Sequence, residues 1–229
     1  MRILKFAGIC TVGFLIALGL TAYRLLPDEV PIEKINSSVV RTPNLIERAW
    51  HLPVAATFGQ HVAGQSNLSR CGPSSLANVF RSLAERSATE DAVLAGTGMC
   101  WSGYCIPGLT LDELSGVAAA HTSRKVTVLR DLTPEQFLDH IRRSNDPSRR
   151  YVVNFRRKEI FDAGGGHFSP IAGYLEDLDF VFVLDVNNHF QPWLVARSRL
   201  YSAVNTLDGN KKRGLLLIEC NGHEHPRRQ

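Results

Sequence analysis

Apolar residues in one segment of the first half of the chain recur with helical spacing. Four of them stand at positions i, i+3, i+4 and i+7, namely Leu76, Val79, Phe80 and Leu83. This spacing predicts a helix with one buried face that begins near Cys71. Pro73 fits the first turn of that helix, where a missing N–H costs nothing. Thr110 and Thr133 each begin a capping pattern, with Glu113 and Gln136 three residues later, and predict two further helices.

The second half of the chain is richer in short runs of β-branched and aromatic residues. Four such runs predict strands, at residues 151–155, 167–175, 179–186 and 214–219. A short helix is expected between them at 198–204. Because helices dominate the first half and strands the second, the order predicts an α+β fold with a helical layer packed on an antiparallel sheet.

Two of the predicted strands are close enough in sequence to form a hairpin. If the turn is centred near Glu176, residues whose numbers sum to about 352 lie opposite each other, and His167 then faces Asp185. Directly opposed residues have their Cβ atoms roughly 4.5–5.5 Å apart on one face of a sheet. A carboxylate in that position can hold an imidazole by one ring nitrogen.

Cys71 is a candidate nucleophile, because a thiol at the positive end of a helix is favoured as the thiolate. Gln65, six residues upstream, could donate its side-chain amide to an oxyanion that forms beside the sulfur. Taken alone, Cys71 could equally be a buried structural cysteine. A His and an Asp brought together by a hairpin favour the catalytic interpretation of Cys71 over the structural one.

The chain begins with a positive segment that is followed by an uncharged apolar stretch from Phe6 to Tyr23. This pattern predicts that residues 1–26 are a signal peptide or an N-terminal membrane anchor. We therefore expect a protein that is exported, either periplasmic or anchored to the inner membrane facing the periplasm. Residues 27–50, which contain several prolines, are expected to be a linker. A single domain is expected over 51–221, and a tail over 222–229.

Charge and cysteine content indicate which partners and ligands are not expected. The net charge of +4 is mild, and no Lys/Arg block with interleaved aromatics occurs, so nucleic acid is not an expected partner. The five cysteines show no metal-binding spacing. Cys100 and Cys105 could form a loop disulfide in an oxidising compartment, and the sequence leaves the thiol and disulfide forms open. A homodimer is likewise left open.

Seven stretches of the chain together resemble the phytochelatin synthase family, a branch of the papain-like cysteine peptidases. They are residues 65–83, 108–114, 153–160, 165–172, 185–186, 205–208 and 212–214. The resemblance implies a papain-like fold and no required cofactor. The longer members carry a Cys-rich C-terminal region, and this chain resembles the short bacterial-type form without it. Strong metal regulation is therefore not expected, although soft divalent ions such as Cd or Zn, bound as thiolates of the substrate, could stimulate the reaction.

The resemblance also implies a role for each matching residue. Cys71 would attack glutathione, release glycine and carry a γ-glutamylcysteinyl group. His167 would be the general base and acid, Asp185 its orienting partner, and Gln65 part of the oxyanion hole. Four residues would bind the substrate: Asn154, Gly166, Asp208 and Arg213. The loop between the last two is about two residues shorter than in the family.

The acyl group would pass either to water, which gives hydrolysis, or to a second glutathione, which gives phytochelatin synthesis. Arg156, Arg157 and Lys158 could supply cations for that second substrate, or could be an exposed strand edge. Two other functions compete with this interpretation. One is a C39-like peptidase that cleaves leader peptides after paired glycines, and the other is a non-catalytic module that binds thiols or metals.

Overall fold

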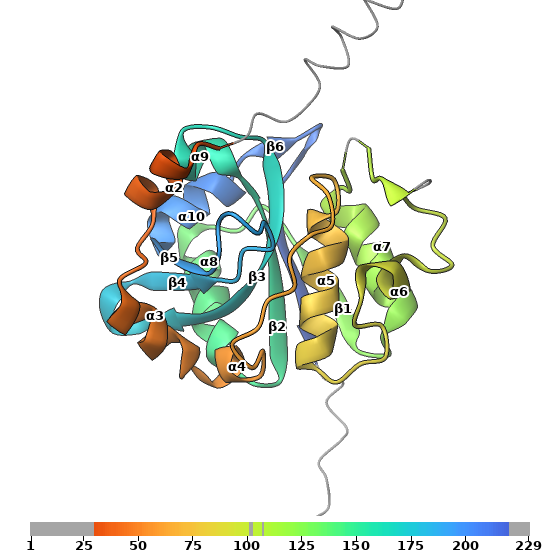
Figure 1. The fold of residues 1–229 in the computed structure, drawn as a ribbon, viewed down its shortest axis with the longest axis horizontal. Coiled ribbons are helices and arrows are strands. Elements are labelled where there is room, and N and C mark those ends of the chain that lie inside the picture. Colours follow the sequence, from red (N-terminus) through yellow and green to blue (C-terminus); the bar gives the residue numbers. More distant parts are fainter. Residues whose placement is uncertain (1–29, 101–102, 107, 220–229) are drawn as a thin grey trace, which may run out of the picture.

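The computed structural model describes residues 30–100, 103–106 and 108–219 (Figure 1). The predicted leader or anchor at 1–26 and the predicted tail at 222–229 lie outside these residues. Within the described part of the chain, no helix is long and apolar enough to cross a membrane.

The centre of the molecule is a six-stranded antiparallel sheet with the order β1-β8-β2-β3-β4-β5 (Figure 1). Its strands are β1 (Lys125–Leu129), β2 (Arg149–Arg156), β3 (Gly166–Leu175), β4 (Phe180–Val183), β5 (Trp193–Ala196) and β8 (Gly214–Glu219). A separate two-stranded hairpin consists of β6 (Leu207–Asp208) and β7 (Lys211–Lys212). The strands predicted from sequence are all present, and the central strand β3 is almost wholly buried.

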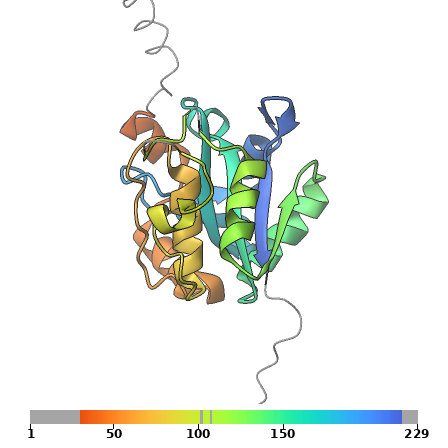
Figure 2. The same cartoon turned by 90° about the vertical axis from the view of Figure 1, so that its right-hand side faces the viewer.

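One face of the sheet is covered by the helix that begins at Cys71. The helices on this face are α3 (Pro43–Trp50), α4 (Pro53–Ala56), α5 (Cys71–Ser82), α6 (Glu90–Leu94) and α7 (Leu111–His121). The apolar side of α5 packs on alternate residues of the strands, with Leu76, Val79 and Phe80 fully buried. Thr110 and Glu113 form the predicted capping box at the start of α7. Figure 2 shows α5 standing in front of the central strands.

The opposite face of the sheet is also covered by helices, whereas the sequence predicted a helical layer on one face only. They are α2 (Ile32–Ser38), α8 (Pro134–Arg142), α9 (Arg157–Phe161) and α10 (Arg197–Val204). The 3-10 turn η2 (Arg143–Asn145) directly follows α8. A second apolar core lies between these helices and the strands. The fold class is therefore confirmed as α+β, but the sheet is buried on both faces rather than on one.

Residues 30–50, which were expected to be part of a linker, are instead part of the domain. Pro31 and Pro43 do not break structure here, because they lie at the starts of α2 and α3, where proline is tolerated. Between these helices the backbone of Val40 exchanges two hydrogen bonds with Leu194 of β5. The linker expectation is wrong for this segment.

The hairpin between β3 and β4 forms, but its predicted register is wrong. The turn is the 3-10 segment η3 (Glu176–Leu178), so the hairpin is centred later than Glu176. A β-bulge follows, and past it Ile171 pairs with Val183. The N–H of Leu184 then donates to the carbonyl of Pro170, which places Asp185 level with Ser169 rather than with His167.

Candidate active site

Cys71, His167 and Asp185 come together at the junction of α5 with the β3–β4 hairpin. His167 Nε2 lies 2.8 Å from Asp185 Oδ1. The other ring nitrogen is left for the Cys71 thiol, which is a hydrogen-bond partner of His167. The backbone N–H of Phe168 also bonds to the sulfur. Cys71 is 9% exposed, and His167 and Asp185 are 3% exposed each. The three side chains therefore lie together, as predicted, in a site that is largely shielded from water.

The Asp185 carboxylate is held by more than the imidazole. Trp193 Nε1 donates to Oδ2 at 3.0 Å, and the backbone N–H of Asn187 donates to Oδ1 at 2.9 Å. A buried carboxylate with several donors is fixed in position and has its charge satisfied. The sequence did not point to Trp193, because its contact with Asp185 depends on the pairing of β5 with β4.

The electrostatics of the pair favour a thiolate beside an imidazolium. Burial raises the pKa of the Cys71 thiol, but hydrogen bonding and charge from His167, the Phe168 N–H and the Arg157 guanidinium outweigh it and leave the pKa lowered. Burial lowers the pKa of His167, whereas the charge and hydrogen bond of Asp185 and the neighbouring Cys71 raise it to about 9. A thiol with a lowered pKa next to a histidine that keeps its proton is an activated nucleophile.

Gln65 lies on the loop that leads into α5. Its backbone N–H donates to the carbonyl of Val186 at 2.7 Å, which ties this loop to the residue after Asp185. Its side-chain Nε2 donates to the carbonyl of Asn67 at 3.0 Å. Because a primary amide has two hydrogens, this bond leaves a second one for an oxyanion.

The four predicted substrate-binding residues form one cluster. Arg213 Nη1 donates to Asn154 Oδ1 at 2.7 Å, Arg213 Nη2 lies 3.0 Å from Asp208 Oδ1, and Asn154 Nδ2 donates to Asp208 Oδ2 at 3.2 Å. A side chain at Gly166 would collide with the Arg213 guanidinium, because a Cβ built there would lie 2.5 Å from Nη1. The shortened loop between Asp208 and Arg213 therefore still closes the pair, through the tight β6–β7 hairpin.

This cluster lies near the thiol. Arg213 is 8% exposed, its Nε has no hydrogen-bond partner, and its charge interacts with that of Cys71. A buried guanidinium with an unused donor, next to a carboxylate, offers binding groups for both ends of a zwitterion.

Only one of the three basic residues considered for a second substrate is buried. Arg156 and Lys158 are exposed, whereas Arg157 is 6% exposed, and its Nε has no hydrogen-bond partner. The Arg157 guanidinium lies over the ring of Phe190 and interacts electrostatically with Cys71. Sequence alone could not separate Arg157 from its neighbours, because the change from β2 to α9 at this position turns it inward.

Among the described residues, no group of three or more His, Cys, Asp or Glu is arranged to hold a metal ion. Cys71 is a free thiol, while Cys100 and Cys105 are joined by a disulfide. Cys220, His223 and His225, which carry further side chains that could bind a soft cation, lie outside the described residues.

Comparison with known proteins gives a consistent result. The family model for phytochelatin synthase matches residues 26–215. A glutathione γ-glutamylcysteinyltransferase of Schizosaccharomyces pombe is 30% identical over 117 residues, which are 49% of this chain and 28% of that protein. Glutathione γ-glutamylcysteinyltransferase 2 of Arabidopsis thaliana is 27% identical over 179 residues, 67% of this chain and 37% of that protein. The chain thus matches less than half the length of these two relatives.

A solved structure resembles the fold at a greater distance. The C39-like peptidase from Bacillus anthracis superposes with a TM-score of 0.53 at 12% sequence identity, over 72% of this chain and 96% of the other. At this identity the likeness concerns the fold alone. It confirms the papain-like arrangement in which a helix carrying the cysteine packs on an antiparallel sheet.

Proposed function

The chain belongs to the phytochelatin synthase family, and from that membership we propose that it is a cysteine enzyme that transfers the γ-glutamylcysteinyl group of glutathione. One observation carries the proposal. The activated Cys71–His167 pair lies beside a buried acid–base cluster, in which Arg213 bonds to both Asn154 and Asp208. The nucleophile and the groups that can bind glutathione are therefore adjacent.

The first half-reaction is attack on the Cys–Gly amide. The Cys71 thiolate forms a bond to the carbonyl carbon, and the carbonyl oxygen becomes an oxyanion that the Gln65 amide can stabilise. His167, held as an imidazolium by Asp185, gives its proton to the amide nitrogen. The C–N bond then breaks, glycine leaves as a neutral amine, and the γ-glutamylcysteinyl group remains on Cys71 as a thioester.

The second half-reaction regenerates the thiolate. Neutral His167 takes a proton from water or from the amine of a second glutathione, which attacks the thioester carbon while the C–S bond breaks. Water gives γ-glutamylcysteine, and glutathione gives a chain longer by one γ-glutamylcysteinyl unit. Arg157 supports the second outcome, because its buried unpartnered Nε near the thiol could bind a carboxylate of the acceptor.

The acid–base cluster favours glutathione over a leader peptide. The γ-glutamyl end of glutathione carries an α-ammonium and an α-carboxylate on one carbon. Asp208 can accept from the ammonium and Arg213 can donate to the carboxylate, with Asn154 linking the two. A leader peptide cleaved after paired glycines has no such zwitterion at the corresponding distance from the scissile bond. The likeness to C39-like peptidases concerns the fold and adds no second candidate.

Two accessory properties are part of the proposal. Export to an oxidising compartment is supported by the apolar stretch from Phe6 to Tyr23 and by the Cys100–Cys105 disulfide, since disulfides persist in such compartments. Stimulation by Cd or Zn would act through metal thiolates of the acceptor glutathione. Periplasmic fractionation and mass spectrometry of the intact protein would test export and leader retention.

The decisive experiment is product analysis by mass spectrometry. Purified protein is incubated with glutathione, with and without Cd²⁺, and in parallel with a double-glycine peptide. We expect glycine release and γ-glutamylcysteine or extended chains from glutathione, none of it with Cys71→Ser. Cleavage of the peptide without glycine release from glutathione would replace this function by the peptidase. Inertness toward both would leave the non-catalytic binding module.

A further inference from the structure

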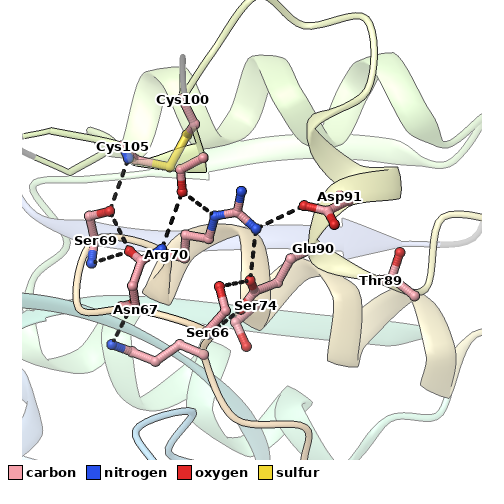
Figure 3. A network of polar contacts seen from close by, with 12 residues as sticks. Ser66, Asn67, Ser69, Arg70, Ser74, Thr89, Glu90, Asp91, Cys100 and Cys105 are labelled. Atoms are coloured by element: carbon pink, nitrogen blue, oxygen red, sulfur yellow. Dashed lines mark hydrogen bonds and ion pairs between the residues drawn. A yellow bond between two sulfur atoms is a disulfide. The ribbon is translucent and has the colours of Figure 1, made fainter.

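The loop that contains Gln65 is held in place by a disulfide-closed loop from a distant part of the chain (Figure 3). Gly103, between Cys100 and Cys105, offers its carbonyl to two donors: Asn67 Nδ2 at 3.2 Å and Arg70 Nε at 2.7 Å. The backbone N–H of Cys105 donates to Ser69 Oγ at 2.9 Å. Three hydrogen bonds, involving Asn67, Ser69 and Arg70, thus connect the disulfide loop to the segment before Cys71.

Asn67 connects the disulfide loop to the Gln65 side chain. The carbonyl of Asn67 accepts the Gln65 Nε2 donor at 3.0 Å and also the backbone N–H of Arg70 at 3.1 Å. Its side-chain Oδ1 accepts both the N–H and the hydroxyl of Ser69. Asn67 is therefore fixed from both sides, and the direction of the Gln65 amide depends on it.

A second anchor closes the network on the side of α6. Glu90 accepts from the backbone and the hydroxyl of Ser66, and it pairs with Arg70 Nη1 at 3.2 Å. Asp91 pairs with the same nitrogen at 2.8 Å. The side chains of Arg70 and Glu90 are 12% and 14% exposed, so their pairing is largely shielded from water. This anchor holds Ser66 at the start of the loop, and Arg70 at its end is held by both this anchor and Gly103.

Within the described part of the chain, the hydrogen bonds of Cys71, His167 and Asp185 do not involve the disulfide loop. His167 and Asp185 are positioned by β3, by Trp193 and by the N–H of Asn187. Loosening the disulfide loop should therefore leave the thiolate–imidazolium pair intact and disturb only the Gln65 amide, which is proposed to stabilise the oxyanion. This separation makes the role of the loop measurable.

We infer that the Cys100–Cys105 disulfide and Asn67 are positioning elements of the oxyanion hole and act through Gln65. The inference rests on the proposed roles of Cys71 and Gln65. Without the disulfide, the Gly103 carbonyl is no longer held against Asn67 and Arg70. The Asn67 backbone carbonyl then becomes more mobile, and the Gln65 amide is no longer held in a single orientation. The transition state then loses stabilisation that the bound ground state did not have.

The test is a double-mutant cycle between the disulfide and Gln65, with kcat and KM as readouts. The variants are Cys100→Ser/Cys105→Ser, Gln65→Ala and their combination. Outright loss of an oxyanion donor lowers kcat by about 10²–10³, so we expect about a tenfold loss from its misplacement. KM should change less than about twofold, because uniform binding is untouched. In the Gln65→Ala background the disulfide should have no further effect, since residues that act through one another are not additive.

Two further variants keep the result interpretable if the disulfide-free protein folds poorly. Asn67→Ala removes the bond from Asn67 to Gly103 and the two bonds from Ser69 to the Asn67 side chain, while the disulfide remains, and it should reproduce the loss in kcat. Thr97→Ala is the matched control, because the Thr97 hydroxyl bonds to Leu94 and Met99 in the same connection between α6 and α7 and, among the described residues, makes no hydrogen bond to residues 65–70. It should keep the parent kcat. The rate at which iodoacetamide alkylates Cys71 should have the same pH dependence in all variants.

Each assay is run with glutathione and with p-nitrophenyl acetate, whose acylation of a thiol also needs an oxyanion hole. If the parent protein accepts only the ester, the proposed function fails and the cycle still tests the positioning role. Parent-like kcat without the disulfide, losses that multiply with that of Gln65→Ala, or a shifted alkylation profile would each overturn the inference.

Discussion

His167 and Asp185 are bonded at 2.8 Å although they are not opposite each other in the hairpin. Near the turn, Gly173 pairs with Phe182, but past the bulge Ile171 pairs with Val183, so β3 contains one residue more than β4 over this stretch. Without that extra residue, Asp185 would be level with Pro170, and its side chain would point to the opposite face from His167. With it, Asp185 is level with Ser169, on the same face as His167, and the two side chains meet diagonally.

Asn145 stabilises this bulge. Its Nδ2 donates to the carbonyl of Tyr174 and its Oδ1 accepts the N–H of Tyr174, each at 2.9 Å. Asn145→Ala should lower the free energy of unfolding by about 1–3 kcal/mol, because both backbone groups lose their partner, and should lower turnover. Urea denaturation measures the first effect. Asn145→Asp, which can still accept the N–H, is the control and should be intermediate. Wild-type stability of the Ala variant would mean that other contacts hold the bulge.

Asp185→Asn should lower kcat for glycine release by about 10²–10⁴-fold, the range expected when acid–base catalysis is lost. The neutral amide of this variant lacks the charge that holds the His167 imidazolium, although its oxygen can still accept the hydrogen bond from Trp193 Nε1. The matched control is Asp179→Asn in the same hairpin, whose carboxylate pairs with Arg197. Steady-state kinetics on both variants decide the matter. Equal rates for Asp185→Asn and the wild type would refute the orienting role of this carboxylate.

The pH dependence of kcat/KM should be bell-shaped. Activity needs the thiolate, so it is lost as the pH falls below the lowered pKa of Cys71, and it needs the imidazolium, so it is lost as the pH rises through about 9, the pKa of His167. In Asp185→Asn the basic limb should move to lower pH, because the carboxylate charge no longer supports the proton. A basic limb that stays in place in this variant would contradict the assignment.

The same pKa of His167 predicts a pH-dependent contribution to stability. The folded-state pKa is raised from 6.5 to about 9, so the stabilisation from the His167–Asp185 contact is fully present below 6.5 and is lost as the pH rises through 9. The difference in free energy of unfolding between the wild type and Asp185→Asn should therefore shrink between these values. Denaturation at a series of pH values measures it, and a constant difference would argue against a charged pair.

Arg213→Lys should weaken glutathione binding. A lysine cannot bond to Asn154 and Asp208 with two nitrogens while offering a third donor to the substrate. Loss of one charge-assisted hydrogen bond costs about 1.5–3 kcal/mol, which corresponds to an increase in KM of about 10- to 100-fold. Arg197→Lys, which changes an Arg–Asp pair elsewhere, is the control and should keep the parent KM. An unchanged KM in Arg213→Lys would remove this cluster from the binding site.

Most of the local structure could be predicted from the sequence because short-range physics decides it. The start of α5 at Cys71 follows from the spacing of Leu76, Val79 and Phe80 and from Pro73 in the first turn. The capping boxes at Thr110 and Thr133 depend on residues only three positions apart. The hairpin between β3 and β4 is likewise local. The family resemblance, which rests on seven stretches, was enough to select the residues that the structure brings together.

Tertiary structure alone decided the features that depend on contacts distant in sequence or on small changes in backbone path. The bulge after Ile171 sets the face on which Asp185 lies, and no pattern of apolar residues records one extra residue in a strand. The helices at 32–50 lie on either side of Val40, whose bridge to Leu194 joins segments far apart in the sequence. Gly103 reaches Asn67, and Arg213 reaches Asn154, across long stretches of chain whose closure depends on the whole packed domain. Periodicity in a sequence reports which side of an element is buried, but the partner of each buried polar group is chosen by the packing of the complete fold.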